Sequence, residues 1–126
     1  MDTASKEALL LELKHKKPTV KWLTRMIEGF DLIDIWAIWE SEIIFDNFIY
    51  GLMKIENATE DDIIACLDKV ILRFNEIGAL PTAKYGAFIE TVEREEILMY
   101  LAEAATTAGL RSDVDIDDMV NVVRDW

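Results

Sequence analysis

The sequence predicts an all-α fold, a compact bundle of five long helices plus a short C-terminal helix. Three observations lead to this prediction. Apolar residues recur at helical spacing along most of the chain, and residues that favour helix ends stand at the breaks between these stretches. Only five glycines and two prolines interrupt the 126 residues, and the 52% hydrophobic content is enough for a core. We expect one domain spanning residues 1–126.

The first predicted helix covers residues 3–16 and begins after a cap at Asp2 or Thr3. Its narrow apolar stripe consists of Leu9, Leu10 and Leu13. Pro18 ends it, because proline lacks the backbone N–H that a helix interior needs. The second predicted helix covers residues 19–29 and ends on a glycine. Its apolar positions are Val20, Leu23, Met26 and Ile27, with Trp22 beside them.

The third predicted helix, residues 31–55, is apolar around most of its circumference. Its exposed positions form one acidic arc of about 120°, at about 100° per residue. This arc contains Asp31, Asp34, Glu42 and Asp46. Two strands are an alternative because Ile, Trp and Phe favour strands, but no Gly or Pro between residues 31 and 50 provides a hairpin turn. The charges also argue against a membrane span, since each costs about 2.5–3.5 kcal/mol at the bilayer centre.

The remaining helices have clear end signals. Thr59 and Asp62 form a variant capping box for a helix that ends at Gly78. Its apolar face is the most regular in the chain and consists of Ile63, Leu67, Val70, Ile71, Phe74 and Ile77. After a loop over residues 79–88, the fifth helix covers residues 91–108. Its apolar face contains Ile97, Leu98, Leu101, Ala104, Ala105 and Ala108. A last short helix follows, capped by Asp115.

The formal net charge of −12 is unevenly distributed. Residues 1–30 hold six bases and four acids, whereas residues 31–126 hold seven bases and twenty-one acids. Such a field repels nucleic acid and anionic membranes and attracts basic partners. Acidity that serves only solubility is the alternative interpretation. The single cysteine, Cys66, cannot form an intramolecular disulfide, and a lone thiol is typical of the cytoplasm.

Residues suited to catalysis are scarce, so we expect a protein that is not an enzyme and has no catalytic residues, metal or cofactor. The one histidine, His15, stands in a lysine run that disfavours its protonated form. Cys66 lies beside an apolar stripe and is expected to pack rather than react. Residues 113–117 resemble the start of a calcium loop, but Asp118 occupies the glycine position and Arg124 the position of the bidentate Glu.

A protein partner is therefore the expected ligand, and acidic residues are the candidate contacts. Glu42 and Asp46 lie well inside a predicted helix, where capping of the helix dipole does not explain them. Other acids stand in predicted first turns, where they serve the dipole and remain available to a partner. The candidate partner-binding residues are Asp34, Glu42, Asp46, Glu93, Glu95, Glu96, Asp113, Asp115, Asp117 and Asp118.

The C-terminal third carries a resemblance to a known class of protein. The string ETVEREEI at residues 90–97 is followed by an alanine-rich helix, AGL at residues 108–110 and a closing RDW at residues 124–126. This pattern, over about residues 88–126, is similar to small helical immunity proteins of bacterial polymorphic and contact-dependent growth inhibition toxin systems. The resemblance implies a cytoplasmic protein that binds and blocks one cognate toxin domain, often a basic nuclease. It assigns no contact residue.

Two other functions stay open. An acidic adaptor, such as a secretion chaperone or a nucleic-acid mimic that inhibits a DNA-binding protein, fits the same composition. The basic excess of the first 30 residues does not suit a uniform DNA mimic. An enzyme that uses paired carboxylates, with or without a divalent metal, is the remaining alternative, although chance pairs are expected among 25 acids.

Overall fold

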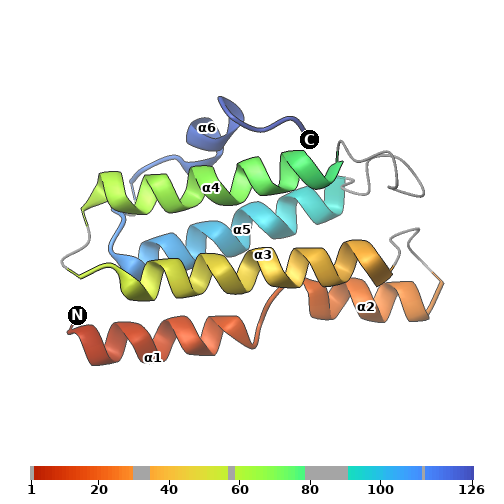
Figure 1. The fold of residues 1–126 in the computed structure, drawn as a ribbon, viewed down its shortest axis with the longest axis horizontal. Coiled ribbons are helices and arrows are strands. Elements are labelled where there is room, and N and C mark those ends of the chain that lie inside the picture. The colour runs from red at the N-terminus through yellow and green to blue at the C-terminus, as the bar shows by residue number, and fades with distance from the viewer. Residues whose placement is uncertain (1, 30–34, 57–58, 79–90, 112) are drawn as a thin grey trace.

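The computed structural model describes residues 2–29, 35–56, 59–78, 91–111 and 113–126. These residues form α-helices and connecting segments (Figure 1). The helices are α1 (Thr3–Lys14), α2 (Thr19–Ile27), α3 (Ile35–Lys54), α4 (Glu60–Gly78), α5 (Thr91–Ala108) and α6 (Ile116–Asn121). The predictions for residues 31–34, which include the candidate contact Asp34, and for the loop at 79–88 lie outside the described residues.

The all-α bundle is confirmed, but the prediction of five long helices is wrong for the second one. Within the described residues, α1, α3, α4 and α5 span 12 to 20 residues, whereas α2 spans nine and α6 six. Pro18 stands directly before α2. Gly29, just beyond its end, has a φ of 79°, which cannot continue a helix. The short α2 therefore follows from its two boundaries.

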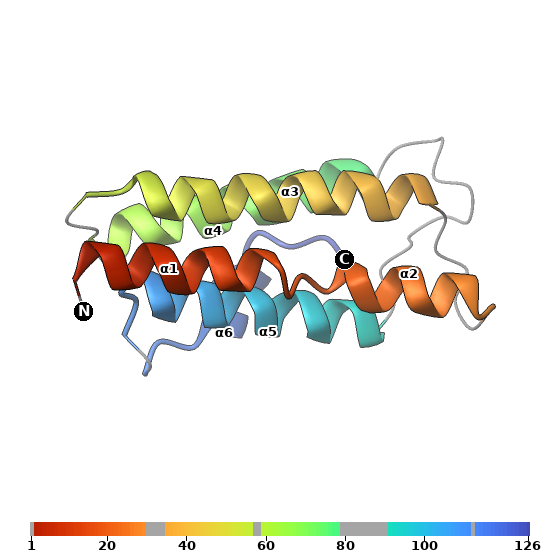
Figure 2. The same ribbon diagram turned by 90° about the horizontal axis from the view of Figure 1, so that it is seen from below.

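Helices α1 and α2 lie end to end and together run along α3 (Figures 1 and 2). Helix α3 also packs against α4, and α5 packs against α1, α3 and α4. Helix α6 lies on the outer side of α4 and α5. Because α1 and α2 act as one interrupted rod, the described residues form a compact packed bundle of four rods with α6 attached.

The core lies between these four rods and confirms the apolar faces predicted for α4 and α5. All six predicted α4 positions are buried, and in α5 only Leu98 is half-buried. Phe45 of α3 stands at the centre, with ring centroids 6.2 Å from Trp22, 5.4 Å from Phe74 and 5.1 Å from Tyr100. Such edge-to-face pairs stabilise a core beyond the area they bury.

The apolar faces predicted for α2 and α3 need correction. Helix α2 packs inward through Trp22, which is fully buried, and through Met26. Its other predicted core positions, Val20, Leu23 and Ile27, are exposed. Trp39 of α3 is also exposed, because α3 is covered by its neighbours only on the sides that face α1, α2, α4 and α5. No helix among the described residues combines the length and apolarity that crossing a membrane requires.

The predicted caps are confirmed by their hydrogen bonds. The carboxylate of Asp2 accepts from the Ser5 N–H at 2.7 Å, which lowers the pKa of Asp2. Thr59 and Asp62 bond reciprocally, each backbone N–H donating to the other side chain at 3.2 Å. Asp115 accepts from the N–H of Asp118 at 3.2 Å. Side chains at the starts of α1, α4 and α6 therefore satisfy backbone donors that a helix cannot satisfy itself.

Candidate protein-binding face

A row of apolar side chains on α3 points into solvent. Ile35, Trp39 and Ile43 are four residues apart and therefore share one side of the helix. Their exposed fractions are 58%, 68% and 42%. A single exposed apolar residue is ordinary, but a row of three with a tryptophan at its centre is typical of a surface that another protein covers.

Helix α2 extends this row. The hydroxyl of Thr19 donates to Glu42 Oε1 at 3.0 Å, which fixes how the two helices align. Because α2 and α3 run in opposite directions (Figure 1), this register puts Leu23 and Ile27 at about the same levels along the bundle as Trp39 and Ile35. We call this surface the α2–α3 face. It comprises Val20, Leu23, Ile27, Ile35, Trp39 and Ile43, all exposed.

Two of the candidate acids border the α2–α3 face. Lys17 Nζ lies 2.8 Å from Asp46 Oδ1 and 3.7 Å from Glu42 Oε1. The lysine side chain is largely covered, whereas both carboxylates stay partly exposed. One cation thus serves two carboxylates, and the group keeps a net negative charge at the edge of an apolar surface. The structure brings Glu42 and Asp46 together as the sequence predicted.

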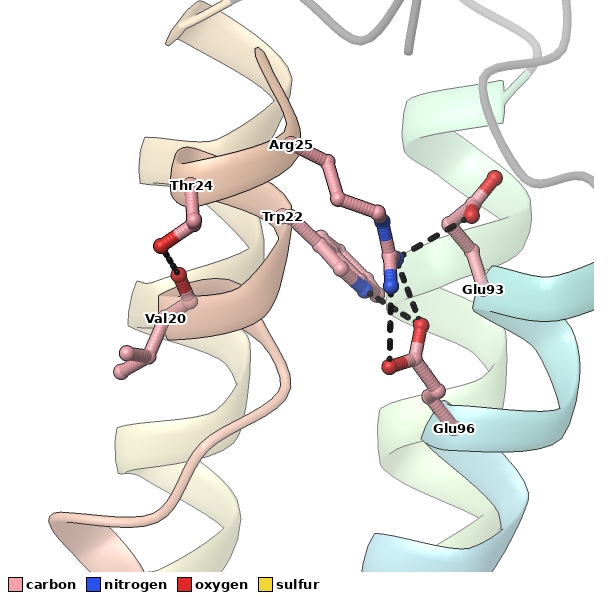
Figure 3. A network of polar contacts seen from close by, with 6 residues as sticks. All are labelled: Val20, Trp22, Thr24, Arg25, Glu93 and Glu96. Atoms are coloured by element: carbon pink, nitrogen blue, oxygen red, sulfur yellow. Dashed lines mark hydrogen bonds and ion pairs between the residues drawn. The ribbon is translucent and has the colours of Figure 1, made fainter. Parts of the chain in front are cut away.

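Glu93 and Glu96 have a different role, shown in Figure 3. Arg25 Nη2 lies 2.6 Å from Glu96 Oε1 and 3.3 Å from Glu93 Oε2, and Nη1 lies 3.3 Å from Glu96 Oε2. The indole N–H of Trp22 also donates to Glu96 Oε1, at 3.2 Å. We call this group the α2–α5 seam. Glu93 is only 3% exposed, so these acids hold helices together and are not open to a partner.

The remaining candidate acids lie elsewhere. Glu95 is exposed on α5. Asp113, Asp115, Asp117 and Asp118 are exposed around the start of α6. Figure 1 places α6 on the opposite side of the bundle from α1 and α2. The described candidate contacts are therefore divided among the edge of the α2–α3 face, the α2–α5 seam, Glu95 on α5 and the α6 end, and do not form one acidic surface.

Comparison with known proteins does not place the chain in a family. No protein-family model matches it, and searches of curated proteins and of solved structures found no match. The resemblance to immunity proteins therefore stays a prediction.

The side chains to consider for catalysis are possible metal ligands, His15 and Cys66. Within the described residues, no three His, Cys, Asp or Glu side chains are grouped so that they could hold a metal ion. His15 is exposed at the C-terminal end of α1. Cys66 is half-buried on α4, and burial raises the pKa of its thiol, which keeps it protonated at neutral pH.

Two features of this region were missed by the sequence analysis, although a signal existed for each. Trp39 is one of the apolar residues of the third predicted helix, yet at about 100° per residue it lies only about 20° from Asp46 and thus on the acidic side. The α2–α5 seam also had a signal in the sequence: Trp22 and Arg25 are three residues apart, and so are Glu93 and Glu96. Residues three apart lie on one side of a helix, so two such pairs can meet where two helices face each other.

Proposed function

We propose that this chain is a cytoplasmic, non-enzymatic binding protein of the bacterial immunity type, which neutralises a cognate basic toxin domain through the α2–α3 face. One observation carries the proposal: Trp39 stands 68% exposed at the centre of an apolar surface. Tryptophan is the residue type most enriched among those that dominate binding energy. The indole would insert into a pocket of the toxin domain, and the surrounding apolar residues would exclude water from it.

The charge of the protein supports a basic partner. Glu42 and Asp46 border the face and keep a net negative charge beside Lys17. The whole chain carries −12. Such a field accelerates association with a basic protein, while the buried apolar contacts set how slowly the complex dissociates. Raising the salt concentration should therefore slow association more than it speeds dissociation.

The proposal requires a toxin gene beside this one, and co-expression with the toxin domain that it encodes is the test. We expect the native chain to rescue growth, and Trp39→Ala to bind the purified toxin domain at least about 30-fold more weakly, a loss of about 2 kcal/mol. Met99→Ala is the matched control, because Met99 is 73% exposed on α5, away from the face. It should bind and rescue like the native chain.

Two results would contradict the proposal. If the native chain fails to rescue cells from that toxin, the protein is not its immunity partner. If Trp39→Ala binds as tightly as Met99→Ala, the α2–α3 face is not the interface. Capture of a secreted effector or of a DNA-binding protein through the same face would support the adaptor alternative instead.

A further inference from the structure

A groove lies between α3 and α4, on the other side of α3 from α2. It encloses about 530 Å³, within the range of about 300–1,000 Å³ that is typical of small-molecule sites. Its apolar lining includes Ile43, which is 42% exposed, and Ile44, Phe48 and Val70, which expose only 3–4% of their surface. We call it the α3–α4 groove. Its lining offers an apolar ligand a place to exclude water.

Gly51 keeps the wall of this groove open. It stands inside α3, where glycine is less favourable than alanine. A Cβ atom at this position would lie 3.7 Å from Cys66 Sγ, an ordinary van der Waals distance. The packing of α3 on α4 therefore does not require glycine. The missing side chain leaves space that a ligand can use.

The charge of the groove is opposite to that of the protein. Among the described residues, its lining includes Lys54, Lys69 and Arg73 but no Asp or Glu, although acids outnumber bases by 25 to 13 in the chain. Arg73 pairs with Glu76 just outside the groove. Lys54 and Lys69 form no ion pair within the part of the chain that the structure describes. A cationic groove in so acidic a protein favours an anionic occupant.

The positions of the cations suggest how a ligand would lie. Lys69 and Arg73 are one turn apart on α4, so both can reach one anionic group. Helices α3 and α4 are antiparallel (Figure 1), and Gly51 faces Cys66. The apolar lining therefore extends from the two α4 cations towards the Gly51 gap, and Lys54 lies at the opposite end.

We propose that the α3–α4 groove binds a small anionic amphiphile, with a carboxylate between Lys69 and Arg73 and an alkyl chain along the apolar lining towards Gly51. Charge complementarity identifies the headgroup, and the apolar lining identifies the tail. The groove adjoins the α2–α3 face through Ile43, which belongs to both surfaces, but the proposal does not depend on the function proposed for that face.

Calorimetric titration with octanoate tests the proposal. We expect saturable binding of one octanoate per chain, at least tenfold tighter than 1-octanol, which has the same chain without the charge. Acetate, which has the charge without the chain, should show no measurable binding. Cys66, the only cysteine, reports on the site because it lines the groove. Octanoate should slow its alkylation by iodoacetamide at least fivefold, and acetate should not.

Three variants locate the site. Gly51→Leu fills the groove and Lys69→Glu reverses a charge at its rim, so each should weaken octanoate binding at least tenfold. Lys21→Glu, an exposed lysine on α2, makes the same charge change elsewhere and should bind within twofold of the native chain. Circular dichroism verifies that each variant is helical. If Gly51→Leu does not fold, Lys69→Glu together with Cys66 protection decides the question.

The proposal is overturned if octanoate binds no tighter than 1-octanol, or if Lys69→Glu and Lys21→Glu bind equally well. It is also overturned if octanoate leaves the alkylation rate of Cys66 unchanged. A dimer detected by sedimentation that Gly51→Leu dissociates would show that a second copy of the chain occupies the groove instead.

Discussion

The surfaces on the two sides of α2 contain the same residue types, tryptophan and carboxylates, but differ in how far these are buried. On the side that meets α5, Trp22 is fully buried and its indole N–H bonds to a carboxylate. On the side that meets α3, Trp39 stands largely in solvent with carboxylates beside the surface. The difference lies in burial: the two carboxylates that Arg25 reaches across the α2–α5 seam are largely covered. Lys17 also reaches two carboxylates, Glu42 and Asp46, but these stay partly exposed beside the apolar row of the α2–α3 face.

The ion pairs of α2 and of the segment before it also explain the basic excess of the first 30 residues. Lys17 pairs with Asp46 and Glu42, and Arg25 pairs with Glu93 and Glu96. The uneven charge along the chain thus serves pairing between the first rod and the rest of the bundle. The net charge remains acidic, but fewer acids are open to a partner than the sequence suggests.

Breaking the α2–α5 seam should have the largest effect. Arg25→Met removes the cation and leaves Glu93 buried without it, so we expect the free energy of unfolding to fall by about 3–5 kcal/mol. Urea unfolding followed by circular dichroism measures this change. Lys21→Met, at an exposed position on the same helix, should stay within about 0.5 kcal/mol of the native chain. Equal stabilities of the two variants would show that the seam does not hold α2 in place.

A second internal contact should have a smaller effect that depends on pH. The Tyr100 hydroxyl donates to the Leu13 carbonyl at 2.8 Å, which ties α5 to α1. Tyr100→Phe should lower the free energy of unfolding by about 1 kcal/mol at pH 7, since the ring can still pack on Phe45. Urea unfolding measures this difference.

The sign of the pH dependence follows from the pKa of Tyr100. Burial, with smaller effects of Asp46 and Glu103, raises this pKa above its ordinary value. The folded state therefore binds the phenol proton more tightly than the unfolded state does. The contribution of the Tyr100 hydroxyl to the free energy of unfolding is complete below about pH 10 and is lost as the pH rises above that value. The advantage of the native chain over Tyr100→Phe should shrink at pH 11, and an unchanged advantage would contradict this assignment.

Much of the fold was predictable because local signals agreed. In α4, the capping pair Thr59 and Asp62 and a regular apolar face point to the same helix. In α5, Gly109, at a φ of 126°, stands just past the helix end, as predicted. For α2 and α3 the periodicity was ambiguous, because apolar residues occupy more than one side. Only the packing of neighbouring helices decides which side is buried, as for Trp22 and Trp39.

The candidate site was predictable only in part. Glu42 and Asp46 could be predicted as contacts because they lie inside a helix, where capping gives them no local role. Both border the proposed interface. Glu93 looked like a first-turn acid, and its partner Arg25 is 68 residues away along the chain. A contact at such a distance has no local signature in a single sequence. The α3–α4 groove was missed for the same reason, since its cations come from two helices.

The α2–α3 face contributes little to the fold and is therefore free for a partner. The most direct test is the free energy of unfolding of Trp39→Ala, measured in urea beside Arg25→Met. We predict that Trp39→Ala stays within about 0.5 kcal/mol of the native chain, as for an exposed residue. A loss of about 3–5 kcal/mol, the usual cost of removing a core tryptophan, would show that Trp39 is part of the core and that the α2–α3 face is not free for a partner.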